Sequence, residues 1–369
     1  MTPPFLVSIV GTRPEAIKMA PVARALARLS GVEHEVFLTG QHGGLEGHFD
    51  LPAGSLRELG FNPRDRDVAR VRAALRALLC GRFRRRPPDL VLVHGDTTSA
   101  AAGALAALDC GIPIAHVESG LRSFDLDRPW PEESHRVAID ALAELLFAPT
   151  DESARNLRME PRVKGRVFVT GNTGIDALLA VQAGIADPPG AEAEEPRRRP
   201  ILVTCHRREN QGEPARAVCG ALRRITAELP VRIAAPLHLN PRARAPFEAE
   251  LAGADHIELL EPQGYEAMVR LMDRSWLILT DSGGLQEEAP ALGKPVLVLR
   301  DVTERPEALT TGNLELVGTD PDRIFDAVAG LLADPERYAR MARPAFPFGD
   351  GRASERIAAA IEAWLGERA

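Results

Sequence analysis

Short apolar runs alternate with helical patterns through the first half of the chain. Each run is rich in β-branched residues and ends in a polar or glycine-containing turn, after which helical periodicity begins. The runs are FLVSIVG, HEVFLTG, LVLVHGD, PIAHVESG, LLFAPT and VFVTGNT. Strands and helices that alternate over this length predict a parallel sheet with helices on both faces.

The same alternation restarts near residue 201 and predicts a second domain of the same kind. Its strand runs are ILVTCHRREN, VRIAAPLHLNP, HIELLEP, WLILTDSGG, PVLVLRD and LELVG. The segment before it, GIADPPGAEAEEPRRRP, is rich in proline, glycine and charge, which is typical of a linker. We therefore predict an α/β protein with two Rossmann-like, doubly wound domains that face each other across a cleft.

The predicted boundaries follow from these patterns. The first domain covers residues 1–174, a helix and the inter-domain linker cover 175–200, and the second domain covers 201–353. The final stretch, 354–369, is amphipathic, with Ile357, Ile361 and Leu365 on one helical face. We predict that this last helix packs back on the first domain.

Composition narrows the class of protein. The chain of 369 residues is 45% hydrophobic and 26% charged, as expected of a globular protein with ample core. A net charge of −7 argues against a nucleic acid or an anionic membrane as partner, because both need excess Lys and Arg. The four cysteines show no C-x-x-C pairing, and no signal peptide or membrane-spanning run is evident, so we expect reduced thiols, no zinc site and a cytoplasmic protein.

Three carboxylates follow predicted strand ends or open a helix in the first domain. Asp96 follows LVLVHG, Glu118 follows PIAHV, and Glu132 begins a helix after a loop with two prolines. Each alone could be a helix cap or a first-turn acidic residue. Three together favour a site that moves protons on and off a substrate.

The second domain carries features that suit a phosphate group. In TDSGGLQEE, residues 280–288, a strand leads through Gly283 and Gly284 into a helix whose N-terminus favours negative charge. His206 lies at another strand end, and Arg13 and Arg305 also follow strands, although each arginine could instead form a surface ion pair. No P-loop or G-x-G-x-x-G motif is present, which argues against a P-loop kinase and against a bound dinucleotide.

Long motifs then indicate a family. They are GTRPEAIKMAP, TGQH, HGDTTSA, HVESGLRS, RPWPEE, LFAPT, VTGNTGIDAL, HRREN, HLNPR, EPQGYEAM, TDSGGLQEEAP, GKPVLVLRDVTERPEA and TGN. The chain closely resembles the non-hydrolysing UDP-N-acetylglucosamine 2-epimerases from its start to about residue 305. The resemblance implies a GT-B-like fold, a homodimer, a UDP-sugar as the ligand, and no nicotinamide cofactor or metal.

The resemblance also implies the reaction and the residues that perform it. UDP leaves first, loss of the C2 proton gives a bound 2-acetamidoglucal, and UDP adds back after protonation on the other face. The implied catalytic residues are Asp96, Glu118, Glu132 and His206. The implied UDP-sugar ligands are Arg13, Lys18, Gln263, Met268, Ser282, Gly283, Gly284, Glu288 and Arg305. Which carboxylate serves which face of the sugar stays open.

The chain departs from the family pattern at three places. Met268 stands where an aromatic residue is usual, and His135 where members usually have Asn. After Gln41 and His42 the chain continues as Gly-Gly-Leu, without the polar side chains that hold a second, activating substrate molecule in some members. Gln41, His42, Arg207 and His238 remain as regulatory candidates, so we predict weak or absent activation.

Four alternatives remain at this point. Two are enzymes with shared features, namely an epimerase of a related UDP-sugar such as a 2,3-diacetamido uronic acid, and a hydrolysing epimerase. The third is a GT-B glycosyltransferase, which would not need three carboxylates for C2 chemistry. The fourth is a nucleotide-sugar sensor, against which the carboxylates also argue.

Overall fold

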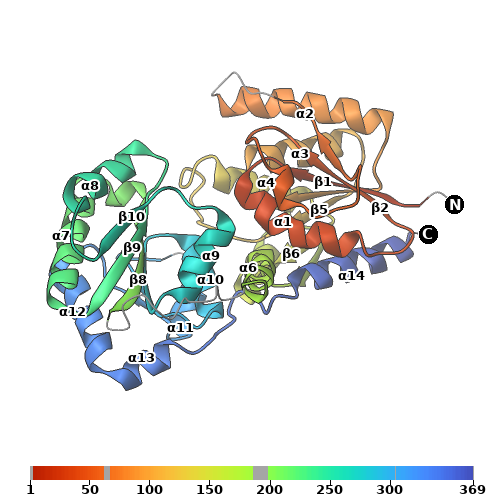
Figure 1. The fold of residues 1–369 in the computed structure, drawn as a ribbon. Helices are drawn as coiled ribbons and strands as arrows, with labels where there is room; N and C mark the ends of the chain where they lie inside the picture. The colour runs from red at the N-terminus through yellow and green to blue at the C-terminus, as the bar shows by residue number, and fades with distance from the viewer. Residues whose placement is uncertain (1–2, 62–66, 186–197, 304, 369) are drawn as a thin grey trace. The chain divides into compact units, whose positions relative to one another are not determined.

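The computed structural model describes residues 3–61, 67–185, 198–303 and 305–368, which form two compact units (Figure 1). Unit 1 extends to Ala177 and resumes at Phe348, and unit 2 covers Leu178–Pro347. The first division therefore falls inside helix α6, Thr173–Ala183, and the second falls six residues before the position chosen from the sequence. Most of the predicted linker lies outside the described residues.

Unit 1 contains a parallel sheet of seven strands in the order β3-β2-β1-β4-β5-β6-β7. The strands are β1 (Phe5–Val10), β2 (Glu33–Leu38), β3 (Leu56–Glu58), β4 (Leu90–His94), β5 (Ile114–Val117), β6 (Leu145–Ala148) and β7 (Arg166–Val169). The helices are α1 (Arg13–Leu26), η1 (Glu46–His48), α2 (Val68–Arg85), α3 (Thr98–Asp109), α4 (Glu132–Leu142), α5 (Asp151–Met159), α6 and α14 (Ala353–Gly366).

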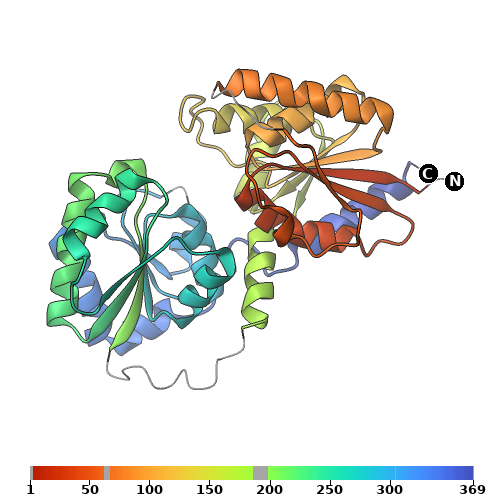
Figure 2. The same cartoon turned by 45° about the horizontal axis from the view of Figure 1, so that its top comes forward.

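Strand β1 shows why both faces of this sheet are covered. Val7 and Ile9 belong to the core beneath α2 and α3, whereas Leu6 and Val10 belong to the core beneath α1 and α14. Because alternate residues of a strand point to opposite faces, an unbroken apolar run needs helices on both. Figure 2 shows α14 in blue beside α1 in red, so the last helix completes the cover of unit 1.

Unit 2 repeats the plan with six parallel strands in the order β10-β9-β8-β11-β12-β13. The strands are β8 (Arg199–Thr204), β9 (Val231–Pro236), β10 (Ile257–Leu260), β11 (Leu277–Thr280), β12 (Val296–Val298) and β13 (Leu314–Leu316). The helices are η3 (Arg208–Asn210), α7 (Glu213–Glu228), α8 (Pro241–Leu251), α9 (Tyr265–Arg274), α10 (Gly283–Ala291), α11 (Pro306–Thr310), α12 (Pro321–Ala333) and α13 (Pro335–Met341). The predicted fold class, two Rossmann-like domains, is confirmed.

The strand order of each unit fixes where a ligand is expected. The chain reverses direction across the sheet between β1 and β4 in unit 1, and between β8 and β11 in unit 2. The loops diverge at such a switch point, and in open α/β sheets ligands bind there, outside the carboxyl ends of the strands. We call this end of each sheet its polar edge. Asp96, His206 and Ser282 lie in the turns after β4, β8 and β11, and Arg13 begins α1 after the turn that follows β1. Within the described ranges, no helix is long and apolar enough to cross a membrane.

Candidate active site

Glu118 lies directly after β5, and its backbone is in the left-handed region with φ of 64°. This conformation is uncommon for a residue other than glycine, and it is found at functional sites where a side chain must point in a particular direction. The carboxylate forms an ion pair with Lys18 Nζ from α1, and the two side chains are 16% and 23% exposed. The predicted catalytic Glu118 and the predicted ligand Lys18 are thus in direct contact.

His94, the last residue of β4, lies beside this ion pair. Its Nε2 is 3.7 Å from Glu118 Oε2 and has no hydrogen-bond partner among the residues that the structure describes. Burial lowers the pKa of His94 to about 4, although Glu118 acts in the opposite direction. The imidazole is therefore neutral near pH 7 and offers a buried polar atom next to the carboxylate.

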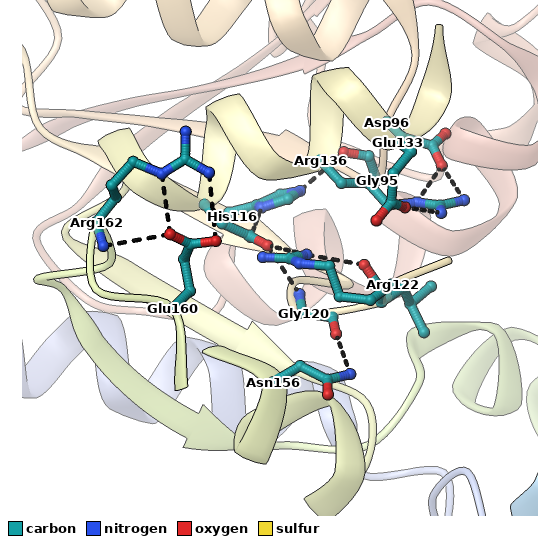
Figure 3. A network of polar contacts seen from close by, with 12 residues as sticks. Gly95, Asp96, His116, Gly120, Arg122, Glu133, Arg136, Asn156, Glu160 and Arg162 are labelled. Atoms are coloured by element: carbon teal, nitrogen blue, oxygen red, sulfur yellow. Dashed lines mark hydrogen bonds and ion pairs between the residues drawn. The ribbon is translucent and has the colours of Figure 1, made fainter. Parts of the chain in front are cut away.

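Asp96 is held by an arginine from α4 (Figure 3). Arg136 Nε and Nη2 lie 2.7 and 2.6 Å from Asp96 Oδ2, and Arg136 Nη1 donates to Glu133 Oε2 at 2.9 Å. Burial lowers the pKa of Arg136, but the two carboxylates raise it further, and the net direction is upward. Arg136 thus fixes Asp96 relative to the helix that follows the loop.

The two adjacent glutamates at the start of α4 differ in their surroundings. Glu133 is buried, and its Oε1 also accepts a hydrogen bond from Phe124 N at 3.2 Å, so both of its oxygens are engaged within the protein. Glu132 Oε2 is buried and has no partner among the described residues. The pair therefore divides into a residue that holds the loop and a residue with a carboxylate oxygen that is available for a ligand.

His135, a departure from the family pattern, contacts the same turn as Arg136. Its Nδ1 lies 2.8 Å from the carbonyl oxygen of Asp96, and a carbonyl can only accept, so Nδ1 carries the proton. Burial lowers the pKa of His135, which keeps the ring neutral. The substituted residue thus anchors the backbone of Asp96 to α4.

Glu15 is a buried residue of the edge that we did not single out from the sequence. Its Oε2 accepts from the N–H groups of Gly11 and Thr12, at 3.0 and 2.7 Å, and its Oε1 accepts from Thr97 Oγ1 at 2.7 Å. Burial raises the pKa of Glu15 to about 7 against these hydrogen bonds. The T-x-x-E spacing of Thr12 and Glu15 is a capping-box signal that could have revealed it.

The other candidates of unit 1 occupy the loop after β2 and the start of α1. Gln41 Oε1 accepts from Ser99 Oγ at 2.7 Å, and His42 Nδ1 accepts from the backbone N–H of Arg13 at 3.4 Å. Arg13 itself is exposed. The amide oxygen of Gln41 is therefore engaged within unit 1.

In unit 2, His206 is paired with a carboxylate that the sequence analysis did not assign to the site. His206 Nδ1 lies 3.0 Å from Oδ1 of Asp281, which is fully buried after β11. Asp281 Oδ2 also accepts from the backbone N–H of Arg207 at 2.8 Å and from Asn210 Nδ2 at 3.0 Å. Burial raises the pKa of Asp281, but His206 and these donors outweigh it and hold it below its usual value.

The N-terminus of α10 lies among cations of unit 2. A Cβ atom built on Gly283 would lie 3.3 Å from Arg207 Nη2 and 3.6 Å from Arg305 Nη2. Arg305 also pairs with the buried Glu287. Two guanidinium groups next to free helical N–H groups make an environment that suits a phosphate.

The remaining candidates of unit 2 lie on or near α9 and α10. Glu288 Oε1 accepts from Tyr265 OH at 3.2 Å, and Gln263 Nε2 donates to the carbonyl of Glu261 at 2.6 Å. Met268 is half-buried, and the exposed His238 stacks on His206 with ring centroids 5.1 Å apart. Among the residues with described side chains, no cluster of three His, Cys, Asp or Glu residues could hold a metal ion.

Known proteins resemble the chain along nearly its whole length. The family model for UDP-N-acetylglucosamine 2-epimerase matches residues 24–362. The chain belongs to the UDP-N-acetylglucosamine 2-epimerase family. The family predicted from the motifs is thereby confirmed.

Individual members of the 2-epimerase family show how far the similarity extends. UDP-N-acetylglucosamine 2-epimerase of Escherichia coli K12 is 43% identical over 380 residues, with 97% of this chain and 98% of that one covered. The enzyme of the same name from Bacillus subtilis 168 is 42% identical over 357 residues, covering 95% and 93%. The crystal structure of UDP-GlcNAc 2-epimerase from Neisseria meningitidis bound to UDP-GlcNAc matches with a TM-score of 0.87 at 38% identity, covering 98% and 100%.

Proposed function

We propose that the protein is an epimerase that interconverts UDP-N-acetylglucosamine and UDP-N-acetylmannosamine. The observation that carries this proposal is the set of three differently held carboxylates, Asp96, Glu118 and Glu132, on the polar edge of unit 1. Inversion at C2 requires a proton to leave one face and another to arrive on the opposite face, so it needs at least two proton-handling groups. The relative bound to UDP-GlcNAc supports the choice of substrate.

The proposed reaction begins with departure of UDP. The C1–O bond breaks, its electron pair leaves with the diphosphate, and a cationic centre forms at C1. Arg207, Arg305 and the start of α10 suit the negative charge of the leaving group, and we assign His206, which pairs with Asp281, to protonate or hydrogen-bond it.

The second half of the reaction exchanges the proton on C2. The cationic C1 makes the C2 proton acidic, a carboxylate takes it, and the C1=C2 bond of 2-acetamidoglucal forms. A carboxylic acid then protonates C2 on the other face, and the diphosphate oxygen adds to C1. Apart from the exchanged C2 proton, all atoms of UDP and sugar are retained and no water is consumed, so the proposed enzyme is non-hydrolysing.

Proton NMR in deuterated water tests the proposal. Purified protein is incubated with UDP-N-acetylglucosamine, and the C2 proton signal and free UDP are followed over time. We expect deuterium at C2, a new set of UDP-N-acetylmannosamine signals and little free sugar. Stoichiometric release of UDP with N-acetylmannosamine would instead show a hydrolysing enzyme, and absence of C2 exchange would reject this substrate.

Two further expectations belong to the same proposal. We propose that the enzyme is a homodimer, which light scattering after size-exclusion chromatography tests directly. We also propose that it resides in the cytoplasm, which fractionation of the source cells tests.

A further inference from the structure

His116 lies in β5 and is fully buried between the turns that carry Asp96 and Glu118 (Figure 3). Its Nε2 is 2.8 Å from the carbonyl oxygen of Gly95, the residue before Asp96. Its Nδ1 is 2.6 Å from Asp140 Oδ1 on α4. One imidazole therefore connects the end of β4, the strand that leads to Glu118, and the helix that Glu132 begins.

The hydrogen bonds fix the protonation of this ring. The Gly95 carbonyl can only accept, so Nε2 carries a proton. Asp140 Oδ2 accepts from Arg122 Nη1 at 2.6 Å and from the backbone N–H of Gly120 at 3.2 Å. Burial raises the pKa of Asp140, but His116 and Arg122 outweigh it and hold this pKa below its usual value, so the carboxylate is ionised and can only accept. Nδ1 must then carry a proton as well, so His116 is an imidazolium.

The network acts on the backbone on both sides of Glu118. Gly95, Glu118 and Gly120 have φ values of 62°, 64° and 83°, all in the left-handed region. Gly120 has little freedom to move, since an added Cβ would meet the carbonyl oxygen of Ser153 at 2.3 Å, and its own carbonyl accepts from Asn156 Nδ2 at 3.1 Å. His116 and Asp140 thus hold the turns after β4 and β5 at fixed positions relative to each other.

The charges of the network are costly for a purely structural element. His116, Asp140 and Arg122 are all at most 5% exposed at the side chain, and together they carry one net positive charge. Removing such charges from water costs several kcal/mol per ion unless geometry and hydrogen bonds compensate, and apolar packing of equal volume is often no less stable. Apolar residues could not form the directional hydrogen bonds that His116, Asp140 and Arg122 form.

We propose that His116, Asp140 and Arg122 are positioning residues that set the relative placement of Asp96 and Glu118. This inference rests on the proposed epimerase function. It assigns the network to the proton transfers at C2, not to binding of the diphosphate by Arg207, Arg305 and the start of α10.

The Asp140→Asn substitution tests the proposal. The amide group cannot accept from both His116 and the Arg122–Gly120 donors as the carboxylate does, so the imidazolium loses its counter-ion. We expect kcat to fall about 100-fold with KM changed less than about threefold, because a shift of about 1 Å in a catalytic group has an effect of this size. The affinity for UDP, measured by calorimetry, should not change.

A matched control separates positioning from general destabilisation. Glu35 on β2 is a buried carboxylate of the same unit, paired with Arg57 and Arg86 away from the polar edge. Glu35→Gln should lower thermal stability as Asp140→Asn does but leave kcat near the wild-type value. Equal kcat values for the two variants would overturn the proposal.

Two variants of Arg122 test the same proposal if Asp140→Asn does not fold. Arg122→Lys retains a cation next to Asp140, and Arg122→Met retains only the length of the side chain. We expect the lysine variant to keep most of the wild-type kcat and the methionine variant to lose it. Equal loss in both variants would contradict a role for the charge.

Nitrogen-15 NMR of histidine gives a readout that does not depend on turnover. The wild-type protein should show both ring nitrogens of His116 protonated, and Asp140→Asn should lose this signal. A neutral ring in the wild type would overturn the network as described. Absence of C2 exchange in a wild type that shows the imidazolium would instead reject the proposed substrate.

Discussion

The side chain of His206 is bound to Asp281, with Nδ1 3.0 Å from Oδ1, while the same carboxylate accepts from the backbone N–H of His206 at 2.9 Å. This arrangement directs Nε2 of the ring away from Asp281. A buried carboxylate behind an imidazole fixes the orientation and the tautomer of the ring.

Asp281→Asn should therefore act through His206. We expect kcat to fall about 10- to 100-fold, the range in which loss of a group that orients a histidine commonly falls. A double-mutant cycle tests this by comparing the kcat values of the wild type, Asp281→Asn, His206→Gln and the double variant. The double variant should be no slower than His206→Gln alone, and additive losses would show that Asp281 acts independently of His206.

Gly283 and Gly284 form a natural pair of test positions at the start of α10. A methyl group on Gly283 would lie 3.3 and 3.6 Å from the guanidinium nitrogens of Arg207 and Arg305, whereas one on Gly284 would meet only Ser282 Oγ at 3.8 Å. We expect Gly283→Ala to weaken UDP binding about tenfold or more, since it fills the space next to the helix N-terminus. Calorimetry with UDP should show near wild-type affinity for Gly284→Ala, and equal affinities would argue against a phosphate site here.

Glu132 and Glu133 should separate catalysis from stability. Glu132→Gln removes a proton-handling oxygen that has no partner among the described residues, and we expect kcat to fall about 10²- to 10⁴-fold with the melting temperature unchanged. Glu133→Gln breaks the pairing with Arg136, and we expect a melting temperature lower by about 4 °C. The reverse pattern would show that the two roles are exchanged.

Velocity curves should be close to hyperbolic. Gln41 Oε1 is engaged by Ser99, and the neighbouring Gly43 and Gly44 offer no side chains to a second substrate molecule. We expect a Hill coefficient of about 1 for UDP-N-acetylglucosamine, since little coupling between sites is retained. Strongly sigmoidal curves that disappear in Gln41→Ala would contradict this prediction.

Mild acid should weaken unit 1 through His34. Burial lowers the pKa of His34 to about 4, and its Nε2 contacts Ser8 Oγ at 2.9 Å. In the unfolded chain the ring binds a proton near pH 6.5, so its stabilising contribution is complete above pH 6.5 and is lost as pH falls towards 4. About 2 kcal/mol of this contribution should be lost by pH 5.

Urea unfolding at pH 7 and pH 5 measures this effect. The free energy of unfolding of the wild type should fall more between these pH values than that of His34→Gln, by about 2 kcal/mol. Glu15 has the opposite dependence because its raised pKa favours the folded state at low pH, but it is present in both proteins. His256→Gln, at an exposed position, should behave as the wild type. The prediction is contradicted if the free energy of unfolding of His34→Gln falls between pH 7 and pH 5 by as much as that of the wild type.

The fold could be predicted from the sequence because a buried parallel strand has a local signature. Residues 5–10 and 90–94 are mostly apolar runs, interrupted only by Ser8 and ended by His94, and polar turns follow them. Both faces of strand β1 are buried. The boundary inside α6 could not be predicted, because α6 is one continuous helix and only tertiary contacts divide it.

The site was only partly predictable for a related reason. Glu118 and Asp96 were found because each follows a strand, but their partners Lys18 and Arg136 come from helices far along the chain. In the sequence Asp281 is an ordinary turn residue, because its contact with His206 depends on the pairing of β8 with β11. Residues whose function lies in orienting another side chain leave no local pattern.

The return of the chain to unit 1 at Phe348 has a consequence for biosynthesis. Helix α14, with Ile357, Ile361 and Trp364 buried against unit 1, follows the whole of unit 2 along the chain. Asp176 caps this helix, accepting from the N–H groups of Ala353 and Ser354 at 3.1 and 2.7 Å across more than 170 residues of intervening chain. Unit 2 can therefore be complete and folded before α14 is made, whereas unit 1, whose first strand is made before any part of unit 2, is completed only when α14 has been synthesised.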